Sequence, residues 1–554
     1  MNTRDYLDGN SFDGYKFFGA HKKEKGYIFR LLAPKADEVY LLGDFNNWEK
    51  SPMRKYATGV FSLSIDGAKE GDSYQYLIVN GEREVKKIDP FAKAIIYEEK
   101  SCLIVDESYK FKYKKKEASP KNILQIHLGS LFKDKGKSEK EVFDAIIKHA
   151  KNNSYSSILL MPVNEYQNYK SLGYSSLNLF SYSRRYGKLT SLKRFIDLAH
   201  KANIQIIIEM DISEFDPDIY GLKDFDGNNL YNYPYEDILY NYFGQINFDI
   251  TEGSCKSYIK SAIDYYLSDY KVDGIYFSSI ENSIFWQGDD SRGVNKEWIE
   301  FIKDINTYIK AKKALALASF NGTYDMNLGF SEVFDNRSKT LINMMKDQPI
   351  RRDDYKKYIN DLIINENSDE ILGFSYVDSY QNEANMPMKM YGNDNKFAQL
   401  KALYTFLYTL KNPKMLFMGD DSGNLKTFSA FDTFDFENIG EKIEGINDFY
   451  KEIVSLWTSQ KTLSDSSSEV ELLDSEGHSL YAYKKKIGKT MSLVVVNFTD
   501  IAYEIKSPYD LSEIFNTEDL KFGGDGNING TLDRGDLIKI KGFSACVFNI
   551  RQSK

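Results

Sequence analysis

Four acidic residues lie where a carboxylate could take part in chemistry. Glu209 and Asp211 stand at the end of one apolar run, and Glu281 and Asp378 come shortly after two others. Paired carboxylates can serve as nucleophile and as acid/base, which is how glycosidic bonds are broken. Whether these acids can act in this way depends on the elements that position them.

Cysteine and histidine give no sign of a metal site. Cys102, Cys255 and Cys546 lie far apart, with neither metal-ligand spacing nor a disulfide framework. His127 and His200 have no ligand partner nearby in the sequence and are expected to pack inside the fold. We therefore expect no metal, no cofactor and a reducing, cytoplasmic environment.

The overall composition limits the range of partners. The 554 residues include 72 Lys and Arg against 81 Asp and Glu, a formal net charge of −9. Nucleic acids and anionic membranes attract basic surfaces, so neither is expected as a partner. No apolar run approaches the ~18 residues of a membrane helix, and residues 1–8 lack the apolar stretch of a signal peptide.

The first part of the chain has the pattern of short strands separated by turns. The runs rich in β-branched and aromatic side chains are residues 27–33, 38–42, 59–65 and 73–79. They predict a β-sandwich over residues 21–108. An N-terminal segment, 1–20, precedes it, and a basic linker, 109–121, follows and is expected to be solvated.

From residue 122 to residue 460, apolar runs alternate with amphipathic helical stretches. The runs are residues 123–128, 157–163, 204–210, 274–277, 314–318, 331–334, 371–377 and 414–418. The helical stretches include 140–151, 191–201, 255–270 and 396–410. Buried strands with crossovers favour an α/β fold, a (β/α)8 TIM barrel. An open doubly wound sheet is the alternative, although no glycine-rich phosphate loop follows any run.

The alternation stops after Trp457. Strand-like runs then recur at residues 480–484, 491–498, 536–540 and 545–550. They predict a C-terminal all-β sandwich over residues 461–554.

A set of short motifs follows one family in order along the chain. The motifs include Tyr6-Leu-Asp-Gly9, Phe18-Gly-Ala-His21, Gly43-Asp-Phe-Asn-Asn-Trp48, Leu160-Met-Pro-Val-Asn-Glu165, Leu172-Gly-Tyr174, Arg185-Tyr-Gly187, Asn327-Leu-Gly-Phe330, Leu416-Phe-Met-Gly419 and Val496-Asn-Phe-Thr499. With them, nearly the whole chain resembles bacterial glycogen (1,4-α-glucan) branching enzymes of the α-amylase superfamily. The resemblance implies a glycogen-binding-type sandwich, an α-amylase-type barrel and a C-terminal sandwich.

The resemblance also implies where the catalytic groups would lie, and there the chain departs from the family. The family's fourth-strand motif, Gly-Leu-Arg-Val-Asp-Ala-Val, carries the nucleophilic aspartate. Here Ser278 stands at that position and Tyr276 replaces the arginine. The fifth-strand motif, Ala-Glu-Glu-Ser, carries the acid/base, and here Leu317 and Ala318 replace both glutamates.

Two further strands depart in the same way. In the seventh-strand motif, Ser-His-Asp-Glu, Tyr376 replaces the histidine and Val377 the aspartate. The third-strand aspartate and histidine become Glu209 and Glu214. All three catalytic carboxylates are therefore missing, and Leu317 and Val377 are expected to make the pocket floor apolar.

Nearby acids could replace the lost carboxylates only if they lie in the right place. The candidates are Glu281, Asp378, Asp211 and Glu209. A displacement of ~1 Å can lower a rate about 100-fold. For each of these acids we expect a solvated or capping role instead.

Two aromatic residues are the candidates for binding glucan. Tyr174 lies in the Gly-Tyr pair that in the family stacks on the innermost glucose. Trp48 ends the turn of the N-terminal module, a region that in relatives can present aromatic rings to glucan. The alternatives are a core role for Tyr174 and packing under the turn for Trp48.

These residues predict a catalytically inactive homologue of branching enzymes that binds α-glucan or regulates glucan metabolism. A protein partner in glycogen metabolism is a further hypothesis. The alternative is an active 1,4-α-glucan branching enzyme or glycoside hydrolase with a rearranged site. A structural or partner-binding role unrelated to sugar also stays open.

Overall fold

The computed structural model describes residues 2–114, 122–133, 136–320, 327–335, 337–380, 383–436, 445–473 and 477–551. The chain divides into two compact units. One contains Met1–Ala118, His127–Asp144 and Leu159–Ser331, and the other contains Ser119–Ile126, Ala145–Ile158 and Glu332–Lys554.

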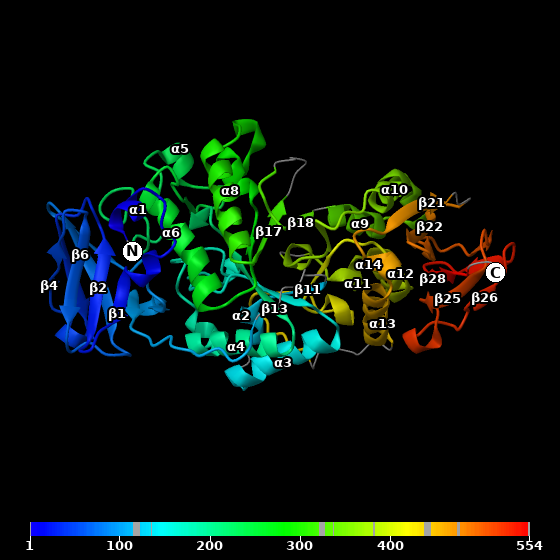
Figure 1. The fold of residues 1–554 in the computed structure, drawn as a ribbon, viewed down its shortest axis with the longest axis horizontal. Helices are drawn as coiled ribbons and strands as arrows, with labels where there is room; N and C mark the ends of the chain where they lie inside the picture. Colours follow the sequence, from blue (N-terminus) through cyan, green and yellow to red (C-terminus); the bar gives the residue numbers. More distant parts are fainter. Residues whose placement is uncertain are drawn as a thin grey trace. The chain divides into compact units, whose positions relative to one another are not determined.

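Two antiparallel sheets form the predicted N-terminal β-sandwich (Figure 1). One sheet has the order β1 (Gly19–Lys22), β2 (Tyr27–Leu32), β6 (Val60–Ile65), β5 (Arg54–Lys55). The other has the order β4 (Ser51–Pro52), β3 (Glu38–Gly43), β7 (Ser73–Asn80), β10 (Ser101–Leu103), β9 (Ile95–Ile96), with β8 (Arg83–Lys87) also paired to β7. Phe29 of β2 meets Tyr74 of β7 edge-to-face at 5.1 Å between ring centroids. This contact joins the two sheets through their apolar faces.

Eight strands close into a barrel, which confirms the predicted (β/α)8 fold and excludes the open sheet. In order around the barrel they are β11 (Asn122–Ile126), β12 (Ser157–Leu160), β13 (Gln205–Met210), β16 (Gly274–Phe277), β17 (Leu315–Phe320), β18 (Glu332–Asp335), β19 (Glu370–Gly373) and β20 (Lys414–Phe417). Each overlaps one predicted run. The run 371–377 was predicted too long, because the chain leaves β19 at Gly373 and forms a 3-10 turn at Tyr376–Ser379.

The long helices include the four predicted amphipathic stretches. They are α3 (Glu139–Asn152), α4 (Leu189–Lys201), α6 (Gly253–Asp264), α8 (Lys296–Ala311), α9 (Arg337–Lys346), α10 (Lys356–Ile364), α12 (Lys396–Tyr408) and α13 (Ile446–Ser459). The stretch predicted to Tyr270 changes after α6 into a π-helical turn at Tyr265–Asp269. Helix α12 is buried over residues 399–408, because it packs against both α13 and the C-terminal sheet.

The C-terminal residues form sheets, as predicted. Six strands pair in the order β21 (Glu469–Leu473), β22 (Leu480–Ile487), β23 (Thr490–Asn497), β28 (Ala545–Ile550), β25 (Leu511–Asn516), β26 (Thr531–Leu532). A second sheet pairs β24 (Tyr503–Lys506) with β27 (Leu537–Ile540). Ile538 and Ile540 of β27 pack into one buried cluster with Leu493 and Phe548 of the larger sheet.

The described part of the predicted linker, residues 109–114, is anchored to α4, and most of its side chains are exposed. Tyr109 Oη and the backbone N–H groups of Lys112 and Tyr113 donate hydrogen bonds to the carboxylate of Asp197 in α4, at 2.8–3.2 Å. Residues 115–121 of the linker lie outside the described residues. The predicted domain boundaries themselves stay predictions.

The structure also describes the three cysteines and the apolar character of the helices. Cys102, Cys255 and Cys546 are free thiols, and each is buried. Within the part of the chain that the structure describes, no helix combines the length and apolar character needed to span a membrane.

Gly373 lets the end of β19 lie close to its neighbour β20. Its φ is +140°, and a Cβ there would lie 1.9 Å from the carbonyl oxygen of Met415. We expect Gly373→Ala to lower the free energy of unfolding by about 3 kcal/mol, because both strain and collision oppose the side chain. Gly488→Ala is the matched control, with a φ of +57° and open space around the Cβ, and should cost about 1 kcal/mol. Thermal and urea unfolding measure both, and equal losses would contradict the assignment.

Candidate functional site

Three positions predicted to lie at the reaction centre form one row across neighbouring strands. Tyr276 of β16 is in register with Glu209 of β13 and with Leu317 of β17. Side chains in register on parallel strands share a face of the sheet. All three residues are buried, Leu317 completely. Ala318, next to Leu317, is also completely buried.

Ser278 follows β16 and is buried, and within the described residues its Oγ has no hydrogen-bond partner. The chain turns directly after it. Ser279 has a φ of +48° and donates its backbone N–H to Ser319 Oγ at 2.8 Å. A serine hydroxyl without a hydrogen-bonded base is a weak nucleophile.

Acidic residues gather at the carboxyl ends of β13 and β16. Asp211 Oδ1 accepts hydrogen bonds from the backbone N and Oγ of Ser213, at 2.8 and 2.6 Å. Burial raises the pKa of Asp211 to about 6, and the charge of Glu281 contributes to the rise. Burial and the charge of Asp211 raise the pKa of Glu214 in β14 (Glu214–Phe215), whose carboxylate accepts a hydrogen bond from Asn241.

Of the four acids for which the sequence predicts a solvated or capping role, Glu209 and Asp211 are buried. Glu209 is 1% exposed and Asp211 is 9% exposed. Their surroundings explain the burial, because Glu209 accepts a hydrogen bond from Tyr174 Oη and Asp211 is held by Ser213. Glu281 begins the short helix α7 (Glu281–Ile284).

Tyr174 lies beside the buried row. The turn before it has Leu172 and Gly173 at φ values of +55° and +99°, and a Cβ on Gly173 would lie 2.8 Å from the Pro162 carbonyl oxygen. This turn sends the half-buried Tyr174 toward Glu209. The structure therefore brings Tyr174 together with Glu209, and stacking on a glucose remains a prediction.

The seventh-strand positions lie in the other compact unit, on the 3-10 turn at Tyr376–Ser379. Asp378 Oδ2 accepts the backbone N–H of Ser375 at 2.9 Å and caps this turn. The backbone N–H of Tyr376 donates to Gln125 Oε1 at 2.8 Å. Val377 is 61% exposed, so it does not form the apolar floor expected from the sequence. A turn, instead of the predicted strand, places it outward.

Trp48 lies in a turn of the N-terminal module that side-chain hydrogen bonds stabilise. Asn47 and Trp48 have φ values of +54° and +62°, and Trp48 Nε1 donates to Asp44 Oδ1 at 2.9 Å. Asp44 Oδ2 in turn accepts the backbone N–H of Ser73 at 2.7 Å. The Trp48 side chain is 38% exposed, so part of it is available to a ligand.

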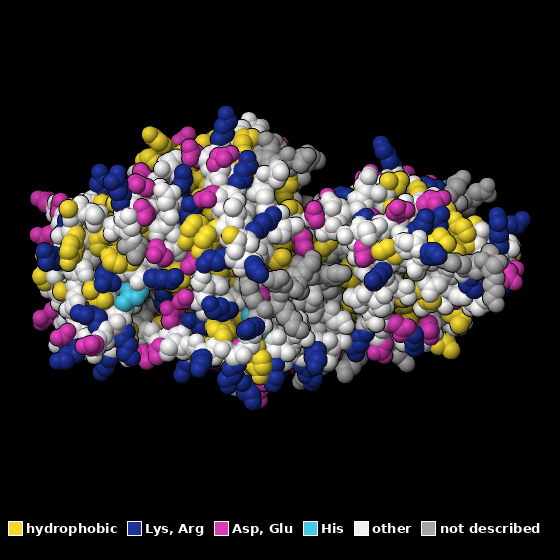
Figure 2. Space-filling view, viewed as in Figure 1, with side chains coloured by type: hydrophobic (Ala, Val, Ile, Leu, Met, Phe, Trp, Pro, Cys, Tyr) yellow, Lys and Arg dark blue, Asp and Glu magenta, His cyan; other side chains and the backbone are white. Residues whose placement is uncertain are grey.

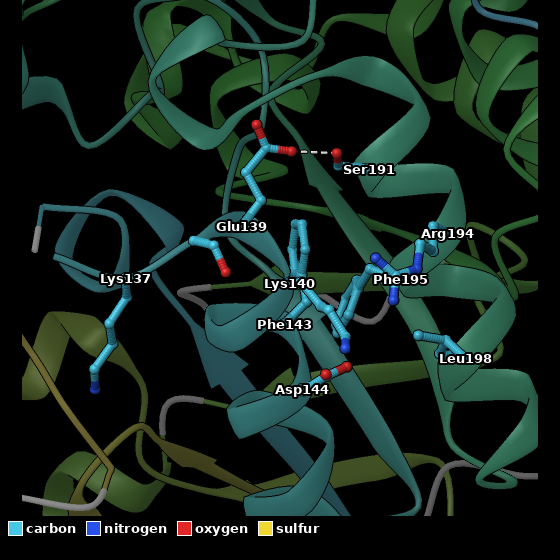
Figure 3. A pocket seen from close by; sticks show the side chains of 10 residues that line it. Lys137, Glu139, Lys140, Phe143, Asp144, Ser191, Arg194, Phe195 and Leu198 are labelled. Carbon is cyan, nitrogen blue, oxygen red and sulfur yellow. Dashed lines mark hydrogen bonds between the residues drawn. The ribbon is translucent and has the colours of Figure 1, made fainter. Parts of the chain in front are cut away.

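A cavity of about 490 Å³ lies away from these positions, between the first turns of α3 and the facing turns of α4 (Figure 3). Glu139 accepts a hydrogen bond from Ser191, and the rings of Phe143 and Phe195 stack at 4.6 Å. The other charged residues that line the cavity are Lys137, Lys140, Asp144 and Arg194. The charges nearly balance, and no predicted site residue lines the cavity.

Sequence reasoning missed Asn241. Its amide holds the Glu214 carboxylate, and its Oδ1 accepts the backbone N–H groups of Phe243 and Gln245, each at 2.9 Å. The available signal was an Asn three residues before Gly244, a common turn pattern. Within the described residues, no group of three His, Cys, Asp or Glu side chains could hold a metal ion.

Comparison with known proteins gives a family match for the N-terminal module and solved structures with the same fold. Residues 17–92 match the family "Carbohydrate-binding module 48 (Isoamylase N-terminal domain)". The fold is shared with the catalytic module of the glycogen-degrading pneumococcal virulence factor SpuA, with a TM-score of 0.76, 15% identity and full coverage of both chains. The class is thus a (β/α)8-barrel protein with a carbohydrate-binding module ahead of the barrel.

The relatives found by sequence belong to a narrower group of proteins than the structural neighbours do. The chain is 27% identical to the 1,4-alpha-glucan branching enzyme GlgB of Clostridium perfringens, over 95% of this chain and 89% of that one. It is also 27% identical to GlgB of Bacillus cytotoxicus, over 94% and 88%. The predicted resemblance to bacterial branching enzymes of the α-amylase superfamily is confirmed.

The raised pKa of Asp211 predicts how the free energy of unfolding depends on pH. Its pKa rises from 3.8 to about 6, so the folded state binds this proton more tightly than the unfolded state does. The stability that this proton contributes is fully present below pH ~4 and is lost as the pH rises through ~6. We expect Asp211→Asn to raise the free energy of unfolding at pH 8 by about 1–3 kcal/mol and to leave it little changed at pH 4.

Asp289 provides the matched control. It accepts the same two hydrogen bonds, from Ser291 N and Oγ at 2.9 and 2.7 Å. Asp289 is exposed, so burial does not outweigh these bonds, and they lower its pKa. Asp289→Asn should therefore bring no gain at pH 8. Urea unfolding across pH 4–8 measures both variants, and an Asp211→Asn variant that is no more stable at pH 8 would contradict the prediction.

Proposed function

We propose that this protein binds α-glucan and does not transfer or hydrolyse it. The observation that carries the proposal is the row of Glu209, Tyr276 and completely buried Leu317, with Ser278 beyond it. These positions would have to supply the nucleophile and the acid/base in a branching enzyme.

Chemistry supports the negative half of the proposal. A retaining glucan transfer needs two carboxyl groups about 5 Å apart, one to attack the anomeric carbon and one to protonate the leaving oxygen. Leu317 and Ala318 have no proton to give. Ser278 Oγ has no described hydrogen-bond partner to take its own proton. These positions therefore supply neither a carboxylate for the attack nor an acid for the protonation of the leaving oxygen.

Glucan binding rests on separate elements. The carbohydrate-binding-module match spans the turn that holds Trp48, and part of that side chain is exposed. Tyr174 adds a half-buried ring beside the row. The relatives are named for α-glucan, which makes this polysaccharide the partner we propose. A cytoplasmic location and regulation of glucan metabolism through a protein partner complete the proposal.

One observation favours a second candidate, an active enzyme with relocated carboxylates. Burial raises the pKa values of both Asp211 and Glu214, and Glu281 lies near enough for its charge to act on Asp211. Neighbouring carboxyl groups with displaced pKa values are typical of acid/base pairs. Asp211, Glu214 and Glu281 would then replace the lost groups.

An activity assay separates the two candidates. We expect purified protein to leave the iodine absorbance of amylose unchanged and to release no reducing ends, because nucleophile and acid/base are both absent. Ser278→Asp alone should restore nothing, since the leaving oxygen would still lack a proton donor and such groups act as a unit. Wild-type activity that disappears in Glu281→Gln or Asp211→Asn would establish the relocated site instead.

Binding is tested on the N-terminal module. We expect glycogen in a native gel to retard the wild-type protein, and Trp48→Ala to weaken the apparent affinity about fivefold, since the ring contributes exposed contact area. Tyr56→Ala is the matched control, because Tyr56 is 45% exposed but belongs to the turn between β5 and β6. Unretarded wild-type protein would remove the glucan-binding proposal.

A further inference from the structure

Two aromatic side chains project from a tight turn directly before β15 (Ile246–Asn247), near the end of the long segment that connects β14 (Glu214–Phe215) to β15. The backbone N–H of Asn241 donates to the carbonyl of Gln245 at 2.9 Å, and Gly244 closes the turn with a φ of +81°. Tyr242 and Phe243 occupy the tip. We call residues 241–245 the aromatic hairpin.

The aromatic hairpin exposes its rings to an unusual degree. Tyr242 is 92% exposed and Phe243 78% exposed, and their ring centroids lie 5.4 Å apart with the planes at 87°. In the space-filling view, hydrophobic side chains project at the edge of the molecule where α5 (Glu236–Leu239) lies in Figure 1 (Figure 2). Folding does not use this apolar area, and such exposed rings mark a surface for binding.

The aromatic hairpin is fixed to the candidate site. Asn241 binds Glu214, the acid that interacts with Asp211 at the end of β13. On the other side, Gln287 Nε2 donates to the carbonyls of Asp237 and Tyr240, at 3.1 Å for Tyr240. Gln287 belongs to the segment after β16, so the base of the aromatic hairpin is tied to the segments that follow β13 and β16. Ligands of barrel proteins bind at this end of the strands.

We propose that Tyr242 and Phe243 form a platform for an α-glucan chain at the carboxyl ends of β13 and β16. This inference rests on the proposed function, that the protein binds α-glucan. The apolar C–H face of a glucose ring suits an exposed aromatic ring, and Tyr242 adds a hydroxyl for hydrogen bonding. Asn241 fixes the turn before any ligand arrives, so little ordering entropy opposes binding.

The alternative occupant, a protein surface, fits the aromatic hairpin less well. A stable protein interface buries about 800 Å² on each partner, whereas the exposed aromatic side chains of this short segment are four: Tyr235, Tyr240, Tyr242 and Phe243. Gln245 beside the rings carries a side-chain amide, and amides are typical partners for sugar hydroxyls.

The test measures the binding of maltoheptaose by calorimetry in a Trp48→Ala background, which weakens the module. We expect Tyr242→Ala with Phe243→Ala to lower the affinity about five- to tenfold, as the loss of two aromatic contacts implies. The exchange Tyr242→Phe with Phe243→Tyr keeps both rings and should keep the affinity. Leu520→Ala, at a residue 71% exposed in the other unit, is the surface control and should change nothing.

Each of the other outcomes contradicts either the proposed function or the aromatic platform. Wild-type protein that binds neither glycogen nor maltoheptaose overturns the proposed function and this platform with it. Wild-type binding that Trp48→Ala weakens but the double alanine variant leaves unchanged overturns the platform alone. If the alanine variant instead abolishes self-association in sedimentation, with glucan affinity unchanged, the rings belong to an interface between copies of this chain.

Discussion

Closure of the barrel is the constraint on which the rest of the structure depends. Eight parallel strands in a closed ring leave room only for side chains, so residues in register must fill one layer together. Glu209, Tyr276 and Leu317 share such a layer. Leu317, completely buried, therefore fills this layer with packed apolar volume. A carboxylate introduced at this position would lie in apolar surroundings, which would raise its pKa.

The same closure determines the electrostatics of the remaining acids. Neutral side chains hydrogen-bond them, with Tyr174 on Glu209, Ser213 on Asp211 and Asn241 on Glu214. Neutral donors lower a carboxyl pKa less than a cation does, and for Asp211 and Glu214 the burial outweighs them. The carboxyl ends of β13 and β16 thus hold buried acidic groups that neutral side chains hydrogen-bond.

The sequence predicted the strands well and the surroundings of single residues less well. All eight barrel runs were visible, because buried parallel strands are apolar on both faces. The end of β19 was not, since Asp378 caps a turn that an apolar run of residues cannot reveal. The surroundings of Glu209 depend on Tyr174 from a distant part of the chain, and the exposure of Val377 depends on the 3-10 turn that Asp378 caps. Local pattern carries no information about such contacts.

Binding and catalysis make different demands on a fold, and the proposed function depends on this difference. The ring of Trp48 is held by Asp44 within its own turn, and the backbone of the turn that carries Tyr242 and Phe243 is held by Asn241. Each binding element is therefore local and survives changes elsewhere. A catalytic pair needs groups from separate strands at once, and losing one member removes most of the rate. Under the proposed function, substitutions at Tyr276 or Leu317 would therefore act on packing alone, whereas the exposed rings would remain the elements on which glucan binding depends.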